Sequence, residues 1–528
     1  MPLPWKFRFK LGRRALLQKH EQYLILILFF LAVLFRFILV RDNSVHFYFD
    51  QARDAYTSRH ILEKKDFKIQ GPSASATDDS VYHGVLYYYL IGPIYTFSGG
   101  NPGAAVSFLI VLTSSAVVPI YLIARGLSGS IIVSLFSAVL YAFSADAAQM
   151  DSQLINSSLA GVTMAWVYYF LWRVFFDGQT KYLPALFLFL GLTQQSAVFS
   201  VYLFWSIAVF YFIRAQEKNR VILFEAKTFV RAAAVYFLAT ASMILTQVRL
   251  FQAGIFSPQK VLSGVRFDVD AAEKFSNIFN FYLRKISNAL FPSLPTISLF
   301  TFFIAFIWFF SQRKYRHTRL FLTVWLLGPL FLFSFAFRDH YHTMVGILPS
   351  IFIILSIALS VLTKTGIGKI LVASFFFLFL LSNFTVLNTY RRQQFDDLSV
   401  QKGAYLQRQI NLIDRTYKIA FGKPFSISSL TAPHGYGTTW AYLYDWYGLK
   451  KYGYKPYWFG GSQVGIPAGE LLERVEKPSD LHFTIYEPDP GTIEFHRLQF
   501  IQLQNDYMGS PSADYRFGRL QLEQRDRY

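Results

Sequence analysis

The stretch HFYFDQARDAYTSRHIL, residues 46–62, follows the first apolar run of the chain and carries two acids and two arginines. Asp50 and Asp54 are four residues apart, so on a helix their carboxylates share one face, while Arg53 points nearly a quarter turn away. This arrangement predicts a catalytic face at the edge of a membrane. An isolated pattern of this kind also fits an amphipathic segment on a membrane surface. The rest of the chain therefore has to decide between the two.

The composition is that of a polytopic membrane protein. Hydrophobic residues make up 53% of the 528 residues and charged residues only 16%, whereas soluble domains carry about a quarter charged residues. The net charge is +19, but the cations lie in loops between apolar runs, which indicates topology signals and contacts with anionic lipids rather than nucleic acid. The chain has no cysteine, which excludes disulfides, thiolate metal sites and thiol nucleophiles.

Eleven apolar runs have the length and hydropathy of membrane spans. They are Glu21–Val40, Ala104–Ala124, Ser130–Met150, Ser158–Phe176, Tyr182–Gln194, Val198–Ile213, Phe229–Phe251, Ile297–Phe310, Leu320–Phe337, Met344–Leu362 and Ile370–Leu387. The first follows a basic N-terminus, as in a signal peptide, but it is long enough to span and no cleavage site follows, so we expect a retained helix. The run Val81–Phe97 contains Gly92-Pro93 and begins with polar residues, which predicts an interfacial helix over residues 81–98.

The distribution of basic residues predicts the orientation. If residues 81–97 do not span, the N-terminal cluster and the basic loops at 214–227 and 312–319 lie on one side, which the positive-inside rule makes cytoplasmic. The outer loops 41–80 and 252–296 then share the other face with the C-terminal tail. We expect a multi-pass protein of the plasma or inner membrane, with a cytoplasmic N-terminus and an extracytoplasmic C-terminal domain.

Two domains are predicted. Residues 1–388 are expected to form an all-α transmembrane domain, and residues 389–528 a small extracytoplasmic α+β domain of ordinary size. The tail is polar and rich in Tyr and Trp, with a helix-like segment Asp396–Ala420 and alternating runs such as FSISSL and LHFTIYEP. Its aromatic segment Tyr436–Gly461 suits either sugar recognition or the core of a small domain.

Other polar residues lie at the same predicted face. His83, at the rim of the interfacial helix, suits a divalent metal, a phosphate or a helix start. Asp151 and Asn156 are expected in an outer turn between two spans, where Asn156 also fits a helix cap. Gln194 and Gln195 lie in a break between short spans and require a polar-lined cavity.

A last polar cluster precedes the tenth run. The segment FRDHYHTMVGILPSIF, residues 337–352, puts Arg338, His340 and Tyr341 together at an outer membrane edge. An arginine beside a histidine at that depth suits a phosphate diester.

In their order and spacing these segments resemble the bacterial branch of glycosyltransferase family 39, the PMT/ArnT-like GT-C integral-membrane transferases. The resemblance covers roughly Phe49–Pro349: an acid-led loop after helix one, the interfacial YHGVLYYY, the turn DSQLINSSL and the late RDHYH followed by a proline. The chain departs from the family at Gln51, where an acid is frequent, at HGVL, where a proline is usual, and at Asn156, where many members have a second acid. The second-acid role then passes to Asp54 or Asp151.

The family implies a GT-C fold and an inverting transfer of a sugar from a polyprenyl-phosphate donor to a hydroxyl acceptor at the outer face. The acceptor is a protein, a lipid or a cell-envelope glycan, and no nucleotide cofactor takes part. Asp50 is the expected base, because a hydroxyl is a weak nucleophile, with Asp54 as the second catalytic acid. The residues expected to offset charge on the donor phosphate are Arg53, His83, Arg338 and His340. Those expected to contact sugar or acceptor are Asp151, Asn156, Gln194, Gln195 and Tyr341.

A divalent metal cation is compatible with this chemistry but not required by it. The candidate ligand is His83, with Asp54 and His340, and their spacing is not diagnostic. The expected partners are the lipid-linked donor, the acceptor and membrane lipids, without nucleic acid.

Three other interpretations fit a polytopic chain. A transporter or flippase would place ionisable residues at the bilayer midplane, often in inverted repeats, whereas here the acids lie in outer loops and the sequence has no internal repeat. A polysaccharide polymerase or ligase would join two lipid-linked chains. A non-catalytic scaffold of the same fold would explain the departures at Gln51 and Asn156.

Overall fold

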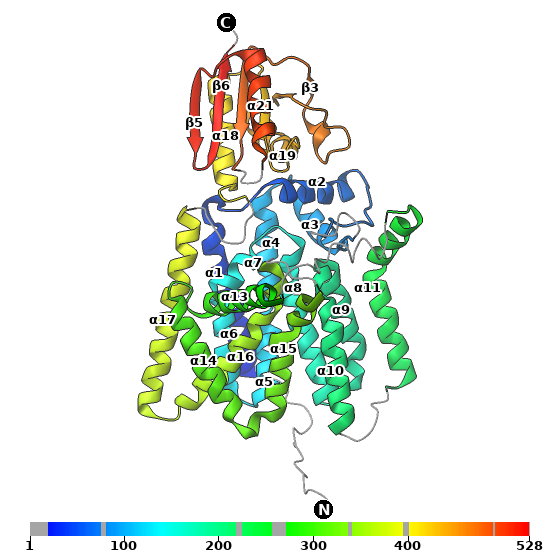
Figure 1. Cartoon of the computed structure of the whole chain (residues 1–528), viewed down its shortest axis with the longest axis vertical. Helices are drawn as coiled ribbons and strands as arrows, with labels where there is room; N and C mark the ends of the chain where they lie inside the picture. Colours follow the sequence, from blue (N-terminus) through cyan, green and yellow to red (C-terminus); the bar gives the residue numbers. More distant parts are fainter. Residues whose placement is uncertain are drawn as a thin grey trace, which may run out of the picture.

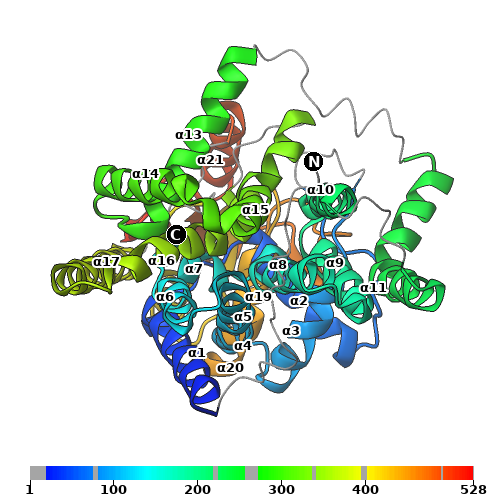
Figure 2. The same cartoon turned by 90° about the horizontal axis from the view of Figure 1, so that it is seen from below.

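The computed structural model describes residues 19–74, 81–217, 224–255, 271–335, 341–393, 401–488 and 492–526. A bundle of helices carries a sheet-containing domain at one end, and helix α2 (Phe49–Glu63) lies flat between the two (Figure 1). Seen from below, α11 and α17 lie at opposite sides of the bundle (Figure 2).

The helices of the bundle and of its domain end follow in chain order. They are α1 (Lys19–Val40), η1 (Arg41–Asn43), α2 (Phe49–Glu63), α3 (Leu86–Phe97), α4 (Pro102–Ser114), α5 (Val117–Ser128), α6 (Ile131–Ala142), α7 (Ala145–Asp151), η2 (Asn156–Leu159), α8 (Ala160–Leu171), η3 (Trp172–Phe176), η4 (Thr180–Tyr182), α9 (Leu183–Ser196), η5 (Val198–Val201), α10 (Tyr202–Glu217), α11 (Ala226–Gln252), α13 (Ala271–Leu290), α14 (Pro295–Ser311), η6 (Arg313–Tyr315), α15 (Arg316–Phe335), η7 (Tyr341–Ile347), α16 (Leu348–Leu362) and α17 (Gly366–Gln393).

Helices lie at all eleven predicted spans. Within the described residues, seven are long and apolar enough to cross a membrane, or up to nine if each of two bent pairs is one span. The bent pairs are α6 with α7 and α13 with α14. The two remaining predicted spans, at Tyr182–Gln194 and Leu320–Phe337, correspond to α9 and α15. The chain is a multi-pass membrane protein, as its composition predicted.

Local sequence explains where several helices begin and bend. Asn101 caps α4, its side-chain oxygen accepting a hydrogen bond from Gly103 N at 2.8 Å, and Pro102 takes the first helical position, where no amide hydrogen is needed. Ser144 caps α7 in the same way through Ala147 N at 3.3 Å. This new helix start separates α7 from α6, and the two axes differ by 58°.

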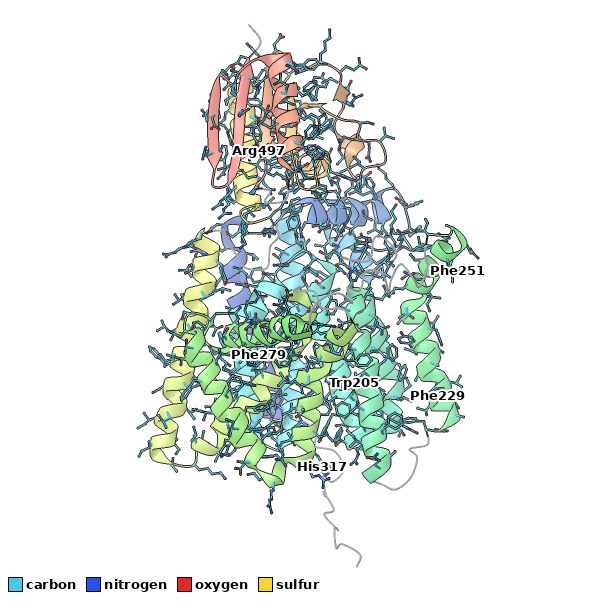
Figure 3. The ribbon with its side chains drawn as sticks, viewed as in Figure 1. Trp205, Phe229, Phe251, Phe279, His317 and Arg497 are labelled. Carbon is cyan, nitrogen blue, oxygen red and sulfur yellow. The ribbon has the colours of Figure 1, made fainter. Side chains whose placement is uncertain are left out.

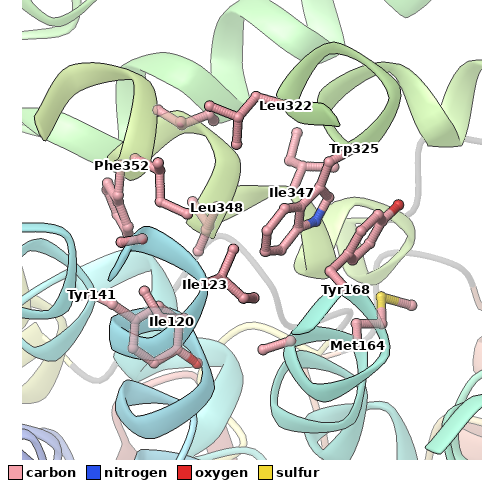
Figure 4. Packing of buried hydrophobic residues seen from close by; sticks show 14 of the residues in the cluster. Ile120, Ile123, Tyr141, Met164, Tyr168, Leu322, Trp325, Ile347, Leu348 and Phe352 are labelled. Atoms are coloured by element: carbon pink, nitrogen blue, oxygen red, sulfur yellow. The ribbon is translucent and has the colours of Figure 1, made fainter. Parts of the chain in front are cut away.

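Close-packed apolar side chains fill the bundle (Figure 4). Tyr168 of α8 stacks on Trp325 of α15 with ring centroids 4.1 Å apart. The indole of Trp325 also donates a hydrogen bond of 2.7 Å to Gly346 O in η7. A bilayer provides little hydrophobic force between helices, so such packing and buried hydrogen bonds fix their positions.

The segment predicted as an outer loop at 252–296 contains the helix α13. It lies across the bundle, and its axis differs from that of α14 by 96° (Figure 1). Its second half is buried, including Phe281, Lys285 and Ile286, whereas most of its first half is exposed. Charged and polar residues lowered the hydropathy of this segment and concealed the helix.

The C-terminal domain is a mixed sheet with helices on it. Its elements are α18 (Leu406–Ala420), β1 (Ser426–Leu430), α19 (Thr438–Leu443), η8 (Tyr444–Gly448), α20 (Leu449–Tyr452), β2 (Tyr457–Phe459), η9 (Gly469–Leu471), β3 (Arg474–Val475), β4 (Leu481–Tyr486), α21 (Glu494–Met508), β5 (Ala513–Phe517) and β6 (Leu520–Asp526). The strand order is β3-β2-β1-β4-β6-β5, with the first four strands parallel and the last two antiparallel. The predicted alternating runs FSISSL and LHFTIYEP are confirmed as β1 and β4.

The C-terminal domain and α2 share one apolar core, which also includes residues of α3 and α4. Backbone hydrogen bonds join Phe47 N to Ala404 O at 3.0 Å and Leu406 N to Val45 O at 2.8 Å. The side chain of Gln409 donates to Phe47 O at 2.7 Å. The domain is therefore attached directly to the segment that carries the predicted acids.

Candidate active site

Helix α2 places the two predicted acids on one face, with an arginine between them. Arg53 pairs with Asp50 at 2.8 Å and with Asp54 at 2.8 Å, from two different guanidinium nitrogens. The expectation that Arg53 points away from the acids is wrong, because its long side chain reaches both neighbours on the helix surface. Gln51 lies at the start of the helix, where its side chain accepts a hydrogen bond from Tyr48 N at 3.1 Å, and so it has a capping role.

The two acids differ in their surroundings. The side chain of Asp50 is 44% exposed and that of Asp54 only 3%. The hydroxyl of Tyr88, from α3, donates a hydrogen bond of 3.2 Å to Asp54. Burial raises the pKa of Asp54 to about 6 although Arg53 opposes the change. Asp50 is the acid that a solvated substrate can reach, while Asp54 orients the arginine from beneath.

The same contacts act on the arginine. Burial lowers the pKa of Arg53, but the carboxylates of Asp54 and Asp50 outweigh this effect and raise it overall. Arg53 is therefore a permanent cation between two carboxylates.

His83, Asn156 and Gln195 form a network of hydrogen bonds between the approach to α3 and the end of α9. Gln195 Oε1 accepts from Leu86 N at 3.2 Å, and its amide donates to Ala239 O at 2.6 Å. His83 Nδ1 accepts from Val198 N at 3.4 Å. These contacts fix the loop that leads from α2 to α3.

Asn156 and Gln194 are bound in the same region. Asn156 donates to Ser196 O at 2.7 Å, and the residue before η2 is Ile155, with no side-chain cap, so the interpretation of Asn156 as a helix cap is wrong. Gln194 Oε1 accepts from the hydroxyl of Tyr236 at 2.5 Å. Its amide nitrogen is buried and has no hydrogen-bond partner among the described residues.

Asp151 is not in a surface turn. It is the last residue of α7, it is 1% exposed, and it pairs with Arg36 of α1 at 2.8 Å. The hydroxyl of Tyr141 adds a hydrogen bond of 3.3 Å. The structure thus places Asp151 in a buried ion pair within the bundle.

Sequence reasoning missed a second buried ion pair on the same helix. Lys285 of α13 binds Asp146 of α7 at 2.6 Å. The available signal was charge within or beside an apolar run, since ionisable residues in membrane segments are costly and nearly always paired. The identity of each partner could not be read from the sequence.

The predicted cationic corner falls mainly outside the described residues. Arg338 and His340 lie there, and Tyr341 begins η7 but its side chain is not described. The described part, η7, packs against α7 and α8. The distance from Asp50 to this corner therefore stays untested.

A groove of about 820 Å³ opens at the domain end of α1, between α1 and α4. Apolar residues such as Leu34 and Phe37 line one part, and the polar Arg41, Asn43 and Asn101 another. None of the predicted site residues lines it. This groove is separate from the acid pair on α2.

The described residues do not fit a divalent metal. No three His, Asp or Glu side chains among them come together as ligands would, and the Nδ1 atom of His83 accepts a backbone hydrogen bond. His340, the third candidate ligand, lies outside the described part of the chain.

No protein-family model matches the sequence, and no curated protein matches it. Among solved structures, the chain is similar to ArnT from Cupriavidus metallidurans in the apo state, with a TM-score of 0.57 and 10% sequence identity over 96% of this chain and 98% of that one. The chain has a GT-C fold. The structure of the same ArnT bound to undecaprenyl phosphate gives a TM-score of 0.57 at 10% identity, over 95% and 97% of the two chains.

The similarity extends over nearly the whole of both chains, so the GT-C fold includes the C-terminal domain. The predicted fold class is confirmed. Membership of family 39 stays a prediction, and at this identity the chemistry has to be argued from the residues of the chain.

Proposed function

We propose that this chain is a membrane glycosyltransferase. It moves a hexosyl or pentosyl group from a polyprenyl-phosphate donor to a hydroxyl acceptor, with inversion at the anomeric carbon. The observation that supports this most is the acid pair with its shared arginine on α2, in a GT-C fold that matches the ArnT structure bound to undecaprenyl phosphate. We place this site on the extracytoplasmic face, with the N-terminus in the cytoplasm.

In the proposed reaction Asp50 is the general base. The acceptor oxygen bonds to the anomeric carbon while the bond from that carbon to the phosphate oxygen breaks. The hydroxyl proton passes to the Asp50 carboxylate, and the electron pair of the broken bond stays on the lipid phosphate. One displacement forms no covalent intermediate, so the configuration inverts. The partial exposure of Asp50 supports this role, since a base must lie within hydrogen-bond reach of the proton that it accepts.

Asp54 is proposed to orient Arg53, and the pair stabilises positive charge that develops on the sugar ring. Arg338 and His340 are proposed to offset the charge of the departing phosphate, with His83 and Arg53 as further contacts. Arg53 already has two carboxylate partners, so Arg338 is expected to contribute more. The proposal routes no step through a metal.

The test uses the purified full chain in liposomes with a panel of polyprenyl-phosphate sugars, with products identified by mass. Asp50→Asn is expected to abolish transfer while lipid-donor binding persists. Arg338→Ala is expected to weaken donor binding. Glu63→Gln is the matched control, because it removes an exposed acid of the same helix that pairs with Arg59. Full transfer by Asp50→Asn would end the base assignment, and no transfer from any lipid-phosphate sugar by the wild type would refute the proposed function.

A further inference from the structure

The carboxyl ends of the parallel strands in the C-terminal domain face α2. The loop after β1 carries Tyr436, whose ring packs edge to face on Phe49 with centroids 5.3 Å apart. The loop after β2 leads to Glu470, which accepts a hydrogen bond from the hydroxyl of Tyr56 and pairs with Lys64 at 3.7 Å. Figure 1 shows the domain directly above α2. In parallel sheets, ligands bind outside the carboxyl ends of the strands.

These two loops contact α2 on either side of Arg53. Tyr436 contacts the first residue of the helix, next to Asp50, and Glu470 contacts its second half. The guanidinium of Arg53 lies 5.7 Å from the Phe49 ring and pairs with Asp50. The loops of the domain therefore flank the acid that the proposed reaction uses.

Aromatic rings and carboxylates alternate along this face and remain accessible. Tyr436 is 38% exposed, and the side chains of Asp50 and Glu470 are 44% and 54% exposed. Further along α2, the rings of Tyr56 and His60 lie 3.9 Å apart. A sugar ring offers apolar C–H faces to aromatic rings and hydroxyl donors to carboxylates.

We propose that α2 and the carboxyl edge of the C-terminal sheet together form the acceptor subsite, and that the acceptor is a carbohydrate. This rests on the proposed function. Tyr436 stacks on the apolar face of the acceptor sugar, Glu470 accepts a hydrogen bond from one hydroxyl, and Asp50 accepts the proton of the hydroxyl that reacts. The C-terminal domain thus selects the acceptor, while the bundle takes the lipid-linked donor.

Two measurements on the purified full chain test this. The first is binding of a neutral oligosaccharide without donor, by saturation-transfer NMR. The second is the KM for the acceptor, measured separately from the KM for the donor, with an oligosaccharide, a serine-containing peptide and a sugar-free hydroxylated lipid offered in turn. Tyr436→Ala is expected to weaken oligosaccharide binding and to raise the acceptor KM about ten-fold. The donor KM should not change.

Two further variants separate a contact with the sugar from a structural effect. Tyr436→Phe keeps the ring and should restore the acceptor KM. Phe421→Ala is the control, since Phe421 is 91% exposed on the same domain, beyond the far end of α18, about 22 Å along a 15-residue helix from the end joined to Val45.

The outcomes separate the subsite from the reaction. Unchanged binding and unchanged acceptor KM in Tyr436→Ala would overturn the inference, as would transfer to the peptide or the lipid alone. If the oligosaccharide binds through Tyr436 but no sugar is transferred, the carbohydrate site stands and the proposed function fails.

Discussion

The ammonium of Lys285 in α13 donates a hydrogen bond of 2.6 Å to the carboxylate of Asp146 in α7, and both side chains are buried. A few residues along, Asp151 at the end of α7 binds Arg36 of α1. The short helix α7 therefore joins α1 and α13 through two ion pairs. Each charge is neutralised where water is excluded, and α13 is fixed across the bundle.

We expect Lys285→Met to destabilise the protein strongly, because it leaves the Asp146 carboxylate buried without its cation. Breaking a buried pair in this way typically costs about 3–5 kcal/mol. Replacing both partners, as Lys285→Met with Asp146→Leu, should recover part of the loss. Denaturant unfolding in detergent measures the effect.

Arg284→Met is the matched control for this pair, since it removes a neighbouring cation that is exposed on the same helix. It should change the free energy of unfolding little. If Lys285→Met unfolds like the control, the ion pair does not stabilise the bundle.

The sequence predicts the elements of this fold better than their partners. Membrane spans and the shared face of Asp50 and Asp54 depend on local spacing, which a single sequence contains. Arg36 and Asp151 are 115 residues apart and Lys285 and Asp146 are 139 apart, so their pairing depends on tertiary structure. For the same reason, hydropathy did not predict that the loops of the C-terminal domain lie beside Asp50.

The raised pKa of Asp54 predicts that sugar transfer slows as the pH falls through about 6. Below that pH Asp54 is protonated, Arg53 is left to Asp50 alone, and the base accepts a proton less readily. Asp54→Asn should remove this part of the pH profile of kcat, whereas Glu63→Gln should keep it. A wild-type profile that is flat from pH 5 to 8 would contradict the assignment.

The same pKa has the opposite sign for stability. The folded pKa of about 6 lies above the ordinary value of 3.8, so the folded state binds more protons in this interval and its stability decreases as the pH rises through about 6. We therefore expect Asp54→Asn to be at least as stable as the wild type at neutral pH, which thermal unfolding checks independently of activity.

His482 is predicted to make the C-terminal domain sensitive to acid. It is buried in β4, where its ring nitrogens lie 2.8 Å from the Ser426 hydroxyl and 2.9 Å from Gln504 Oε1. Burial lowers its pKa from 6.5 to about 3. The unfolded state then binds more protons, so stability present above pH 6.5 is lost as the pH falls toward 3, by up to about 1.4 kcal/mol per pH unit.

Hydrogen exchange of β4 between pH 7 and 4 measures this loss. His482→Gln should have a shallower pH slope whatever its absolute stability, and His496→Gln, on the helix α21, should keep the wild-type slope. Equal slopes in all three proteins would exclude His482 as the acid-sensitive group.

The proposed chemistry also requires the C-terminal domain to be outside the cell, which single cysteines can test in this cysteine-free chain. His317 lies at the end of the bundle away from the domain (Figure 3), while Lys450 is exposed on the domain itself. A membrane-impermeant maleimide added to intact cells should label Lys450→Cys, and should label His317→Cys only after the membrane is opened. Lys364→Cys, in a predicted cytoplasmic loop, should behave like His317→Cys. The reverse pattern would put Asp50 in the cytoplasm, where nucleotide sugars are available, and would remove the reason for a lipid-linked donor.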